Sequence, residues 1–254
     1  MSRRVEALDP RTVMAAYAVG VFPMADHRDA ASVYWVEPRR RAVLPLEGFC
    51  LSRSLRKTIR ADRFRVTADR AFADVLALCA EAVPDRPETW INLGIERAFL
   101  HLHAMGHAHS IECWDGDRLV GGLYGLALGR AFFGESMVSR ATDASKVALA
   151  WLVARLKVGG FELLDCQFQT AHLASLGAVE IGRADYMALL AGALAGADGS
   201  SLAVSGPDAG DFGRLDRLRP APPPAPPGVA PESSVTVSGP LSGKVVAQLL
   251  VQTS

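Results

Sequence analysis

The chain has 254 residues, half of them hydrophobic, and its 27 basic and 27 acidic residues give a formal net charge of zero. A chain of this length and apolar content can form one large or two small globular domains with a real core. No apolar run approaches the roughly 20 residues of a membrane span, and no apolar stretch follows the basic N-terminus. We therefore expect neither a membrane partner nor a secretion signal.

The cysteines are scattered along the chain and form no C-x-x-C pair. This spacing argues against a disulfide framework and against a zinc knuckle, and it favours a reducing environment. We therefore expect a cytoplasmic protein. The cysteines are Cys50, Cys79, Cys113 and Cys166.

Basic residues far outnumber acidic residues between positions 39 and 70. Three of them, Arg53, Arg56 and Lys57, lie on a helix predicted from 52 to 60. A basic face on a neutral protein can hold a polyanion such as RNA through its phosphates. The alternative is a solvated helix face that is rich in Arg.

The predicted elements follow one another in an α+β order. An Asp-Gly turn between two segments with a hydrophobic period of two predicts a hairpin. The predicted helices cover 10–20, 52–60, 68–82, 95–105, 143–158, 171–176 and 183–194, and the predicted strands cover 109–114, 118–129, 130–139, 161–164 and 178–182. This order matches the acetyltransferase-like (GNAT-like) fold, with a mixed sheet whose splayed central strands open a cleft for an acyl donor.

Composition changes sharply near residue 196. The sequence that follows is rich in Gly and Ser and then in Pro, and it cannot bury enough apolar surface to fold. We predict a small N-terminal domain at 1–60, a GNAT-like domain at 61–198 and a disordered, low-complexity Pro-rich tail at 199–254. The last twenty residues are more apolar, and could dock as a strand or short helix or stay loose.

A polar pair stands at the end of a predicted buried strand. Asp165 and Gln167 follow the apolar segment 161–164, and strand alternation puts them on one face with Cys166 on the other. Such a position is where α/β proteins often place chemistry. Alternatively, Asp165 caps the next helix and Gln167 satisfies loop backbone.

Glu135 is a second candidate, because it lies inside a strand beside Phe133 and Met137. We expect it to be buried with a partner and to have a shifted pKa. The glycines of the same strands cost stability unless the backbone needs a close approach or a bulge. These glycines are Gly121, Gly122, Gly125 and Gly134.

Two other candidate sites can be weighed from the residues alone. His103 and His107 are four residues apart, but Gly106 ends the helix between them and no zinc-protease pattern follows, so we expect no metal. Cys166 with His172 downstream suggests a thiol enzyme, but strand alternation turns the thiol away from the polar pair.

Two tryptophans, Trp35 and Trp90, lie in predicted loops beside Pro and charged residues. Such a position suits stacking on a nucleobase. A coenzyme A enzyme of this fold would have a glycine-rich pyrophosphate loop before the helix at 143–158, and the chain has none.

Ten segments of the chain match one family in the order of that family. They are AYAVGVFPM, YWVEPRRRAVLPL, LSRSLRK, TWI, LHLHAMGHAHSIECW, LVGGLYG, FFGESMVS, DASKVAL, LLDCQ and HLASLGAVEIGR, from about residue 12 to residue 195. With these segments the chain resembles leucyl/phenylalanyl-tRNA–protein transferase. It departs from the usual WWSP, which reads YWVEP here, so Tyr34 and Glu37 alter the expected adenosine site.

The resemblance implies transfer of Leu or Phe, and weakly Met, from aminoacyl-tRNA to the N-terminal Arg or Lys of acceptor proteins. The product is a peptide bond and an N-degron. The implied partners are Leu-tRNA, Phe-tRNA and proteins with N-terminal Arg or Lys. The resemblance also implies no cofactor and no ATP, because the tRNA ester is already activated. We expect a monomer.

The resemblance also implies roles for individual residues. Asp165, Gln167 and Glu135 are the implied catalytic residues. The implied substrate-binding residues are Trp35 and Trp90 near the terminal adenosine, and Leu123, Phe132, Gly134, Ser136, Met137 and Leu149 around an apolar pocket. Arg53, Arg56 and Lys57 would hold the tRNA acceptor stem. We expect Gln167 to orient the attacking amine, while Asp165 holds the amide of Gln167 and offsets the developing ammonium.

Three rival functions share parts of this pattern. One is an aminoacyl-tRNA-dependent transferase that builds peptide bridges in cell-wall precursors on the same fold. Another is a non-enzymatic RNA-binding protein, and the third is a thiol hydrolase that depends on Cys166.

Overall fold

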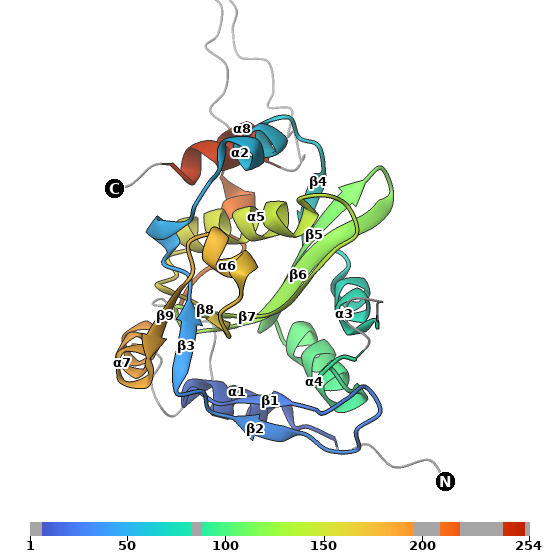
Figure 1. Cartoon of the computed structure of the whole chain (residues 1–254), viewed down its shortest axis with the longest axis vertical. Coiled ribbons are helices and arrows are strands. Elements are labelled where there is room, and N and C mark those ends of the chain that lie inside the picture. The colour runs from blue at the N-terminus through green and yellow to red at the C-terminus, as the bar shows by residue number, and fades with distance from the viewer. Residues whose placement is uncertain (1–6, 83–87, 196–208, 219–240, 252–254) are drawn as a thin grey trace, which may run out of the picture.

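The computed structural model describes residues 7–82, 88–195, 209–218 and 241–251 (Figure 1). The helices are α1 (Pro10–Ala18), α2 (Arg53–Arg60), α3 (Phe72–Ala80), α4 (Leu93–Ala104), α5 (Ala144–Val158), α6 (Ala171–Ser175), α7 (Arg183–Leu194) and α8 (Gly243–Leu249). The strands are β1 (Phe22–Met24), β2 (Tyr34–Val36), β3 (Arg40–Val43), β4 (Arg65–Ala68), β5 (Ala108–Asp115), β6 (Arg118–Leu128), β7 (Ala131–Ser139), β8 (Leu163–Gln167) and β9 (Val179–Gly182). Two short 3-10 helices are η1 (Leu46–Gly48) and η2 (Arg214–Arg217).

A seven-stranded sheet in the order β4-β5-β6-β7-β8-β3-β9 forms the centre, and β1 and β2 form a separate two-stranded ribbon. Neighbouring strands run antiparallel except for β7 and β8, which run parallel. A parallel pair needs a crossover connection, and α5 supplies it over one face of the sheet (Figure 1). The predicted α+β class with a mixed sheet is confirmed.

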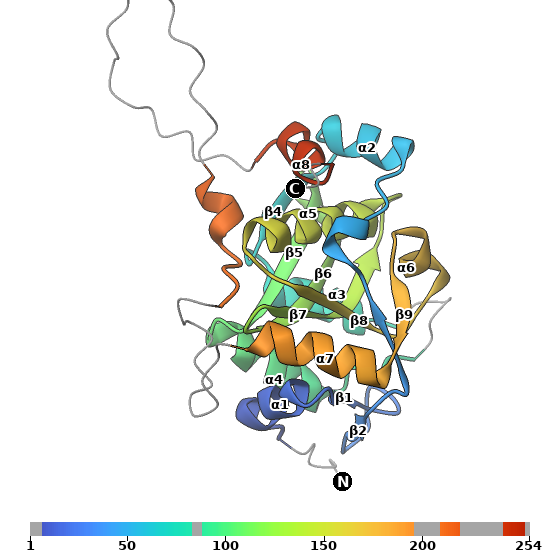
Figure 2. The ribbon, with the colours of Figure 1, turned by 90° about the vertical axis from the view of Figure 1, so that its left-hand side faces the viewer.

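Helices cover both faces of this sheet. On one face lies α5, with α2 and α8 packed on its outer side (Figures 1 and 2). The helices α1, α3, α4 and α7 contribute to a second apolar cluster on the other face. Consecutive strand residues alternate between the two faces. Phe132 belongs to the apolar cluster under α5, and Phe133 belongs to the cluster on the other face. This is the period of two that the sequence shows in these strands.

Local signals place several element ends correctly. The Asp9 side chain accepts a backbone N–H in the first turn of α1, and the Ser52 side chain does so in α2. The hairpin between β5 and β6 turns at Gly116, whose φ of 61° is in the left-handed region that glycine adopts without strain. The predicted hairpin and both helix starts are therefore confirmed.

The helix predicted from residue 68 begins four residues later. Residues Arg65–Ala68 pair with β5 as the edge strand β4, and Asp69 then turns the chain with a φ of 57°. The backbone hydrogen bonds of the sheet edge therefore outweigh the helical spacing of the first few residues.

The predicted N-terminal domain at 1–60 contributes to the central sheet. Strand β3 comes from this segment and pairs with both β8 and β9. The division at residue 60 remains a prediction, but the sheet itself is shared across it.

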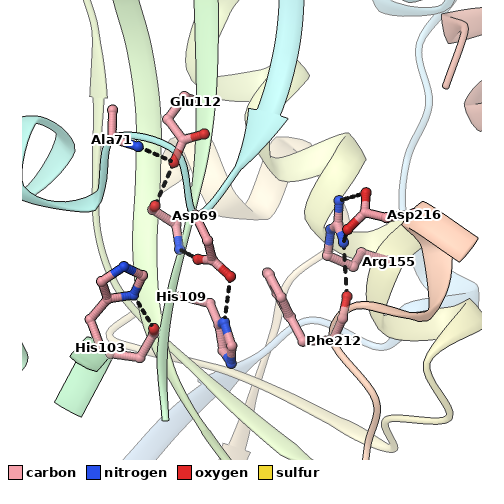
Figure 3. Close-up of polar contacts among 10 residues, drawn as sticks. Asp69, Ala71, His103, His109, Glu112, Arg155, Phe212 and Asp216 are labelled. Carbon is pink, nitrogen blue, oxygen red and sulfur yellow. Dashed lines mark hydrogen bonds and ion pairs between the residues drawn. The ribbon is translucent and has the colours of Figure 1, made fainter. Parts of the chain in front are cut away.

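A first part of the predicted tail, residues 209–218, packs on the core. The Phe212 ring is buried and stacks on His109 with 4.1 Å between the ring centroids. The buried guanidinium of Arg155 donates to the Phe212 carbonyl oxygen (2.8 Å) and to the Asp216 carboxylate (2.6 and 2.7 Å; Figure 3). These residues belong to the folded unit, so the prediction of a disordered tail is wrong for them.

A second part of the predicted tail, residues 241–251, docks through α8. Val246, Ala247 and Leu250 are buried in the same apolar cluster as α5. Of the outcomes weighed for the last twenty residues, the docked short helix is therefore the one found. The proline-rich run at 219–240 lies outside the described residues.

Among the described residues, the structure contains no helix that is both long enough and apolar enough to cross a membrane.

Candidate active site

A pocket opens where the parallel strands β7 and β8 stop pairing. Their last paired residues are Phe133 and Asp165, and the residues beyond them on both strands line a pocket of about 290 Å³. A bulge in the β6–β7 pairing at Gly125 lies at the same level. A side chain at Gly125 would place its Cβ 2.3 Å from the carbonyl oxygen of Phe133, so only glycine fits there.

Most of the predicted substrate-binding residues line this pocket. The residues in its wall that the sequence predicted are Trp90, Leu123, Gly134, Glu135, Ser136, Met137, Leu149 and Gln167. Further apolar wall residues, which the sequence did not single out, are Met24, Leu152, Leu164, Phe168 and Leu173. The pocket wall is therefore largely apolar, and its polar side chains are those of Glu135, Ser136, Gln167, Thr170 and His172.

Phe132 does not line the pocket, so this prediction is wrong. Its side chain is fully buried and packs against Phe161 and Phe212, with ring centroids 6.4 and 5.7 Å away. Phe212 belongs to a segment that the sequence assigned to a disordered tail, so the packing partner could not be anticipated.

Glu135 is buried in the wall of the pocket. The Tyr17 hydroxyl donates to its Oε1 (2.7 Å), and the side-chain amide of Gln167 donates to the same oxygen (3.0 Å). Its Oε2 is buried and accepts no hydrogen bond from the described residues. Burial raises the pKa of Glu135 to about 7, although the two hydrogen bonds lower it. The predicted burial, partner and shifted pKa are confirmed.

Asp165 is fully buried and its oxygens are occupied by hydrogen bonds from the protein. Arg41 donates to both of its oxygens (2.9 Å from Nε to Oδ1 and 2.7 Å from Nη2 to Oδ2), and the Tyr186 hydroxyl donates to Oδ2 (2.8 Å). The backbone N–H of Gln167 donates to Oδ1 (2.7 Å). Asp165 therefore holds Gln167 through its backbone and not, as predicted, through its side-chain amide.

The sequence did not identify Arg41 as a site residue. It lies in the RRR segment that suggested a phosphate-binding surface, but it is buried between the rings of Phe22 and Tyr186, 4.6 and 4.7 Å from their centroids. Strand β3 brings Arg41 to Asp165, because β3 pairs with β8, the strand that carries Asp165. A possible signal was the apolar run that follows Arg41 directly, which is typical of a strand entering a core.

Cys166 lines the same pocket as Gln167, which corrects the predicted alternation. Gln167 has a φ of 62°, so the chain leaves the extended conformation at that residue and the strand period no longer holds. Burial raises the pKa of the Cys166 thiol far above its ordinary value. The thiol therefore stays protonated, which argues against a nucleophilic role.

The two tryptophans take different positions. Trp90 is half-buried in the pocket wall. Trp35 lies on β2 and is 41% exposed, outside the residues that line the pocket. Trp35 pairs with Pro23 across the β1–β2 ribbon, and the neighbouring Met24 does reach the pocket.

The predicted RNA-contacting residues lie on the exposed side of α2. Arg53, Arg56 and Lys57 are exposed, whereas Leu55 and Ile59 of the same helix are buried. None of the three cations forms an ion pair with a residue in the described part of the chain. They are therefore available to a polyanion.

The histidines near residue 105 make contacts within the protein (Figure 3). His103 donates from Nδ1 to the Ala108 carbonyl oxygen, and His109 pairs through Nδ1 with the Asp69 carboxylate, each at 2.8 Å. Within the described ranges, no group of three or more His, Cys, Asp or Glu side chains could hold a metal ion.

Comparison with known proteins gives consistent matches along the chain. A family model described as leucyl/phenylalanyl-tRNA protein transferase matches residues 43–191, and the model of the N-terminal domain of the same family matches residues 6–39. A Rhizorhabdus wittichii protein named leucyl/phenylalanyl-tRNA–protein transferase is 58% identical over 98% of this chain and 100% of its own length. A Novosphingobium aromaticivorans protein of the same name is 48% identical over 98% of this chain and 97% of its own length.

One solved structure is more distant. The structure named L-PGS from Bacillus licheniformis has a TM-score of 0.38 and 12% identity, and covers 65% of this chain and 55% of that chain. A likeness this low carries no argument about either fold or function.

The matches define the protein as an aminoacyltransferase, an enzyme that passes an amino acid from aminoacyl-tRNA to a protein. The chain belongs to the leucyl/phenylalanyl-tRNA–protein transferase family. The resemblance and the enzyme class expected from the sequence are thereby confirmed. The two family models meet between residues 39 and 43, at strand β3.

Proposed function

We propose that this enzyme transfers Leu or Phe, and weakly Met, to the N-terminal Arg or Lys of acceptor proteins and so creates an N-degron. The observation that carries the proposal is the pocket between β7 and β8, whose wall is largely apolar and includes Glu135 and Gln167. In this proposal an apolar amino-acid side chain packs against the apolar wall, and the reacting ester lies beside Glu135 and Gln167.

The apolar wall supports the choice of donor. Leu123, Leu149 and Leu152 line the pocket together with Met137. A pocket of about 290 Å³ suits a branched aliphatic or aromatic side chain. An acidic amino acid would lose its hydration there and would lie near the carboxylate of Glu135.

The polar side chains of Glu135 and Gln167 support the proposed chemistry. The α-amine of the acceptor attacks the ester carbonyl carbon, a C–N bond forms, and the C–O bond to the tRNA ribose breaks as the ribose hydroxyl leaves with a proton. Gln167 donates its amide N–H to Glu135, so its carbonyl oxygen is directed elsewhere and can accept an N–H of the attacking amine. Positioning of the bound ester and the bound amine supplies most of the rate enhancement.

The two carboxylates have different roles in this proposal. Arg41 forms an ion pair with Asp165, whereas no described residue forms an ion pair with Glu135. Glu135 is therefore the carboxylate that offsets the positive charge developing on the attacking nitrogen. Asp165 is a positioning residue, because it fixes the backbone of Gln167 and is itself fully buried.

The remaining parts of the proposal concern the donor tRNA and the setting. Trp90 stacks on the terminal adenosine, Trp35 lies beside it, and Arg53, Arg56 and Lys57 hold the acceptor stem. The enzyme acts as a monomer in the cytoplasm without a cofactor. Its sheet and crossover helix form a GNAT-like domain.

A donor comparison tests the proposal. Leu-, Phe-, Met- and Asp-tRNA, each carrying a labelled amino acid, are supplied with one peptide that begins with Arg. We expect rapid transfer of Leu and Phe, slow transfer of Met and none of Asp. Transfer of Asp at the rate of Leu would contradict an apolar donor pocket, and transfer from no donor would contradict the assigned reaction.

A further inference from the structure

The C-terminal helix α8 lies directly against α2, the helix that carries Arg53, Arg56 and Lys57 (Figures 1 and 2). The buried side chains of α2, Leu55 and Ile59, belong to the same apolar cluster as Val246 and Ala247 of α8. The two helices are almost two hundred positions apart in the sequence, so their contact is purely tertiary.

The start of α8 is fixed to the end of α2 by a close fit. A side chain at Gly243 would place its Cβ 1.8 Å from the Ile59 carbonyl oxygen, so no other residue allows this approach. The backbone N–H of Gly243 donates to the Asp62 side chain (2.6 Å). Asp62 itself has a φ of 47°, in the left-handed region, which positions its carboxylate toward α8.

Helix α2 depends on such support. It has only eight residues, and isolated helices shorter than about 12–15 residues are marginal in water. Its sequence RSLRKTIR contains just two apolar residues, so packing of Leu55 and Ile59 is what holds it. Helices α5 and α8 both pack against α2.

The cations of α2 lie away from this support. Arg53 and Lys57 are four residues apart and lie opposite Leu55 at 100° per residue. They share an exposed face, with Arg56 beside them. A cationic face that is already fixed loses less freedom when it binds phosphates than a mobile one does.

We propose that α8 is a positioning element for tRNA binding: by packing under α2 it fixes the cationic face of α2 against the donor tRNA. The inference rests on the proposed role of Arg53, Arg56 and Lys57. It adds a function to the C-terminal segment and makes Gly243 and Asp62 positioning residues for the tRNA body.

The test compares Gly243→Ala and Asp62→Ala with Gly192→Ala, a matched control. The added Cβ at Gly192, in helix α7, meets no atom within 4 Å. Transfer is measured from Leu-tRNA and from leucyl-adenosine, a minimal donor without a tRNA body. We expect Gly243→Ala to raise the KM for Leu-tRNA about tenfold, the effect of about one lost phosphate contact near 0.1 M salt. We expect kcat, and transfer from leucyl-adenosine, to stay within about twofold, as in the control.

Asp62→Ala removes a hydrogen bond without adding bulk, so it provides the same comparison if Gly243→Ala does not fold. An unchanged KM for Leu-tRNA in the folded variants, or an equal loss with both donors, overturns the inference. Simultaneous replacement of Arg53, Arg56 and Lys57 by Gln separates this failure from a failure of the proposed function. If that variant binds tRNA normally, the assigned role of α2 fails as well.

Discussion

At the scale of single residues, the site separates two carboxylates by their surroundings. Asp165 receives hydrogen bonds from Arg41, Tyr186 and the backbone of Gln167, so its charge is compensated. Among the described residues, Glu135 receives hydrogen bonds only from the neutral groups of Tyr17 and Gln167. Its burial raises its pKa to about 7. Asp165 therefore fixes the geometry of the site, whereas Glu135 can change its charge near neutral pH.

A pH profile of Glu135→Gln tests this difference. In the proposed mechanism, both the acceptor α-amine, with a pKa near 8, and Glu135 must lose a proton before reaction. Below about pH 7 the logarithm of kcat/KM should therefore rise with pH at a slope of about two in the wild-type enzyme, and about one in the variant. Equal slopes in both enzymes would show that ionised Glu135 is not needed.

The stability of the same variant gives an independent measurement. The pKa of Glu135 is higher in the folded than in the unfolded chain, so its stabilising contribution is present below about pH 4 and is lost as pH rises through about 7. We expect urea unfolding to show a smaller decline in the free energy of unfolding over this interval for Glu135→Gln than for the wild type. The same decline in both would contradict the raised pKa.

Met137 and Leu149 test the apolar wall. Each loses part of its contact with the donor side chain when replaced by Ala, and such a contact is worth about 1–3 kcal/mol. We expect Met137→Ala and Leu149→Ala each to lower kcat/KM for Leu-tRNA by about 10–200-fold, mainly through KM. Val251→Ala, at an exposed position, serves as the control. Unchanged kinetics in both pocket variants would remove these residues from the donor site.

At the scale of elements, the sequence predicts those parts whose signal is local. Helix caps at Asp9 and Ser52, the turn at Gly116 and the polar end of β8 depend on a few adjacent residues, and the structure contains them. Strands β3 and β4 were not predicted, because a four-residue strand is defined by the neighbours with which it pairs. Arg41 was missed for the same reason, since its partner Asp165 is 124 positions away.

Helix α2 provides the element-scale prediction. Replacing Arg53, Arg56 and Lys57 by Gln should weaken tRNA binding and reduce the slope of log affinity against log salt by about 0.7–0.9 for each lost phosphate contact. Thermal stability should barely change, because exposed charges contribute little to it. The measurement is a salt titration of labelled tRNA. An unchanged slope with normal folding would place the tRNA elsewhere.

At the scale of the whole molecule, two C-terminal segments complete one face of the fold. Composition alone suggested a tail there, because the short apolar stretches that dock are separated by proline-rich sequence. Phe212 and Val246 are both buried in the apolar cluster that contains the residues of α5. Neither contact could be inferred from the sequence, because each joins segments that are far apart in the chain.

Stepwise truncation tests this completion. Ending the chain after residue 218 removes α8 and exposes apolar surface, and burial of a Val or Leu side chain is worth about 1.5–3 kcal/mol. After the cost of ordering the helix, a net loss of about 2 kcal/mol would lower Tm by about 4–8 °C. Ending the chain after residue 208 should lower Tm further, because Arg155 then loses both Phe212 and Asp216. Equal Tm values for all three lengths would show that neither segment supports the core.

The acceptor preference tests the central claim most directly. Labelled Leu on tRNA is supplied with four peptides that differ only in their first residue, which is Arg, Lys, Asp or Ala. We predict that the enzyme labels the peptides that begin with Arg or Lys and leaves those that begin with Asp or Ala unlabelled. Equal labelling of all four peptides, or labelling of none, would contradict the proposed transfer to N-terminal Arg and Lys.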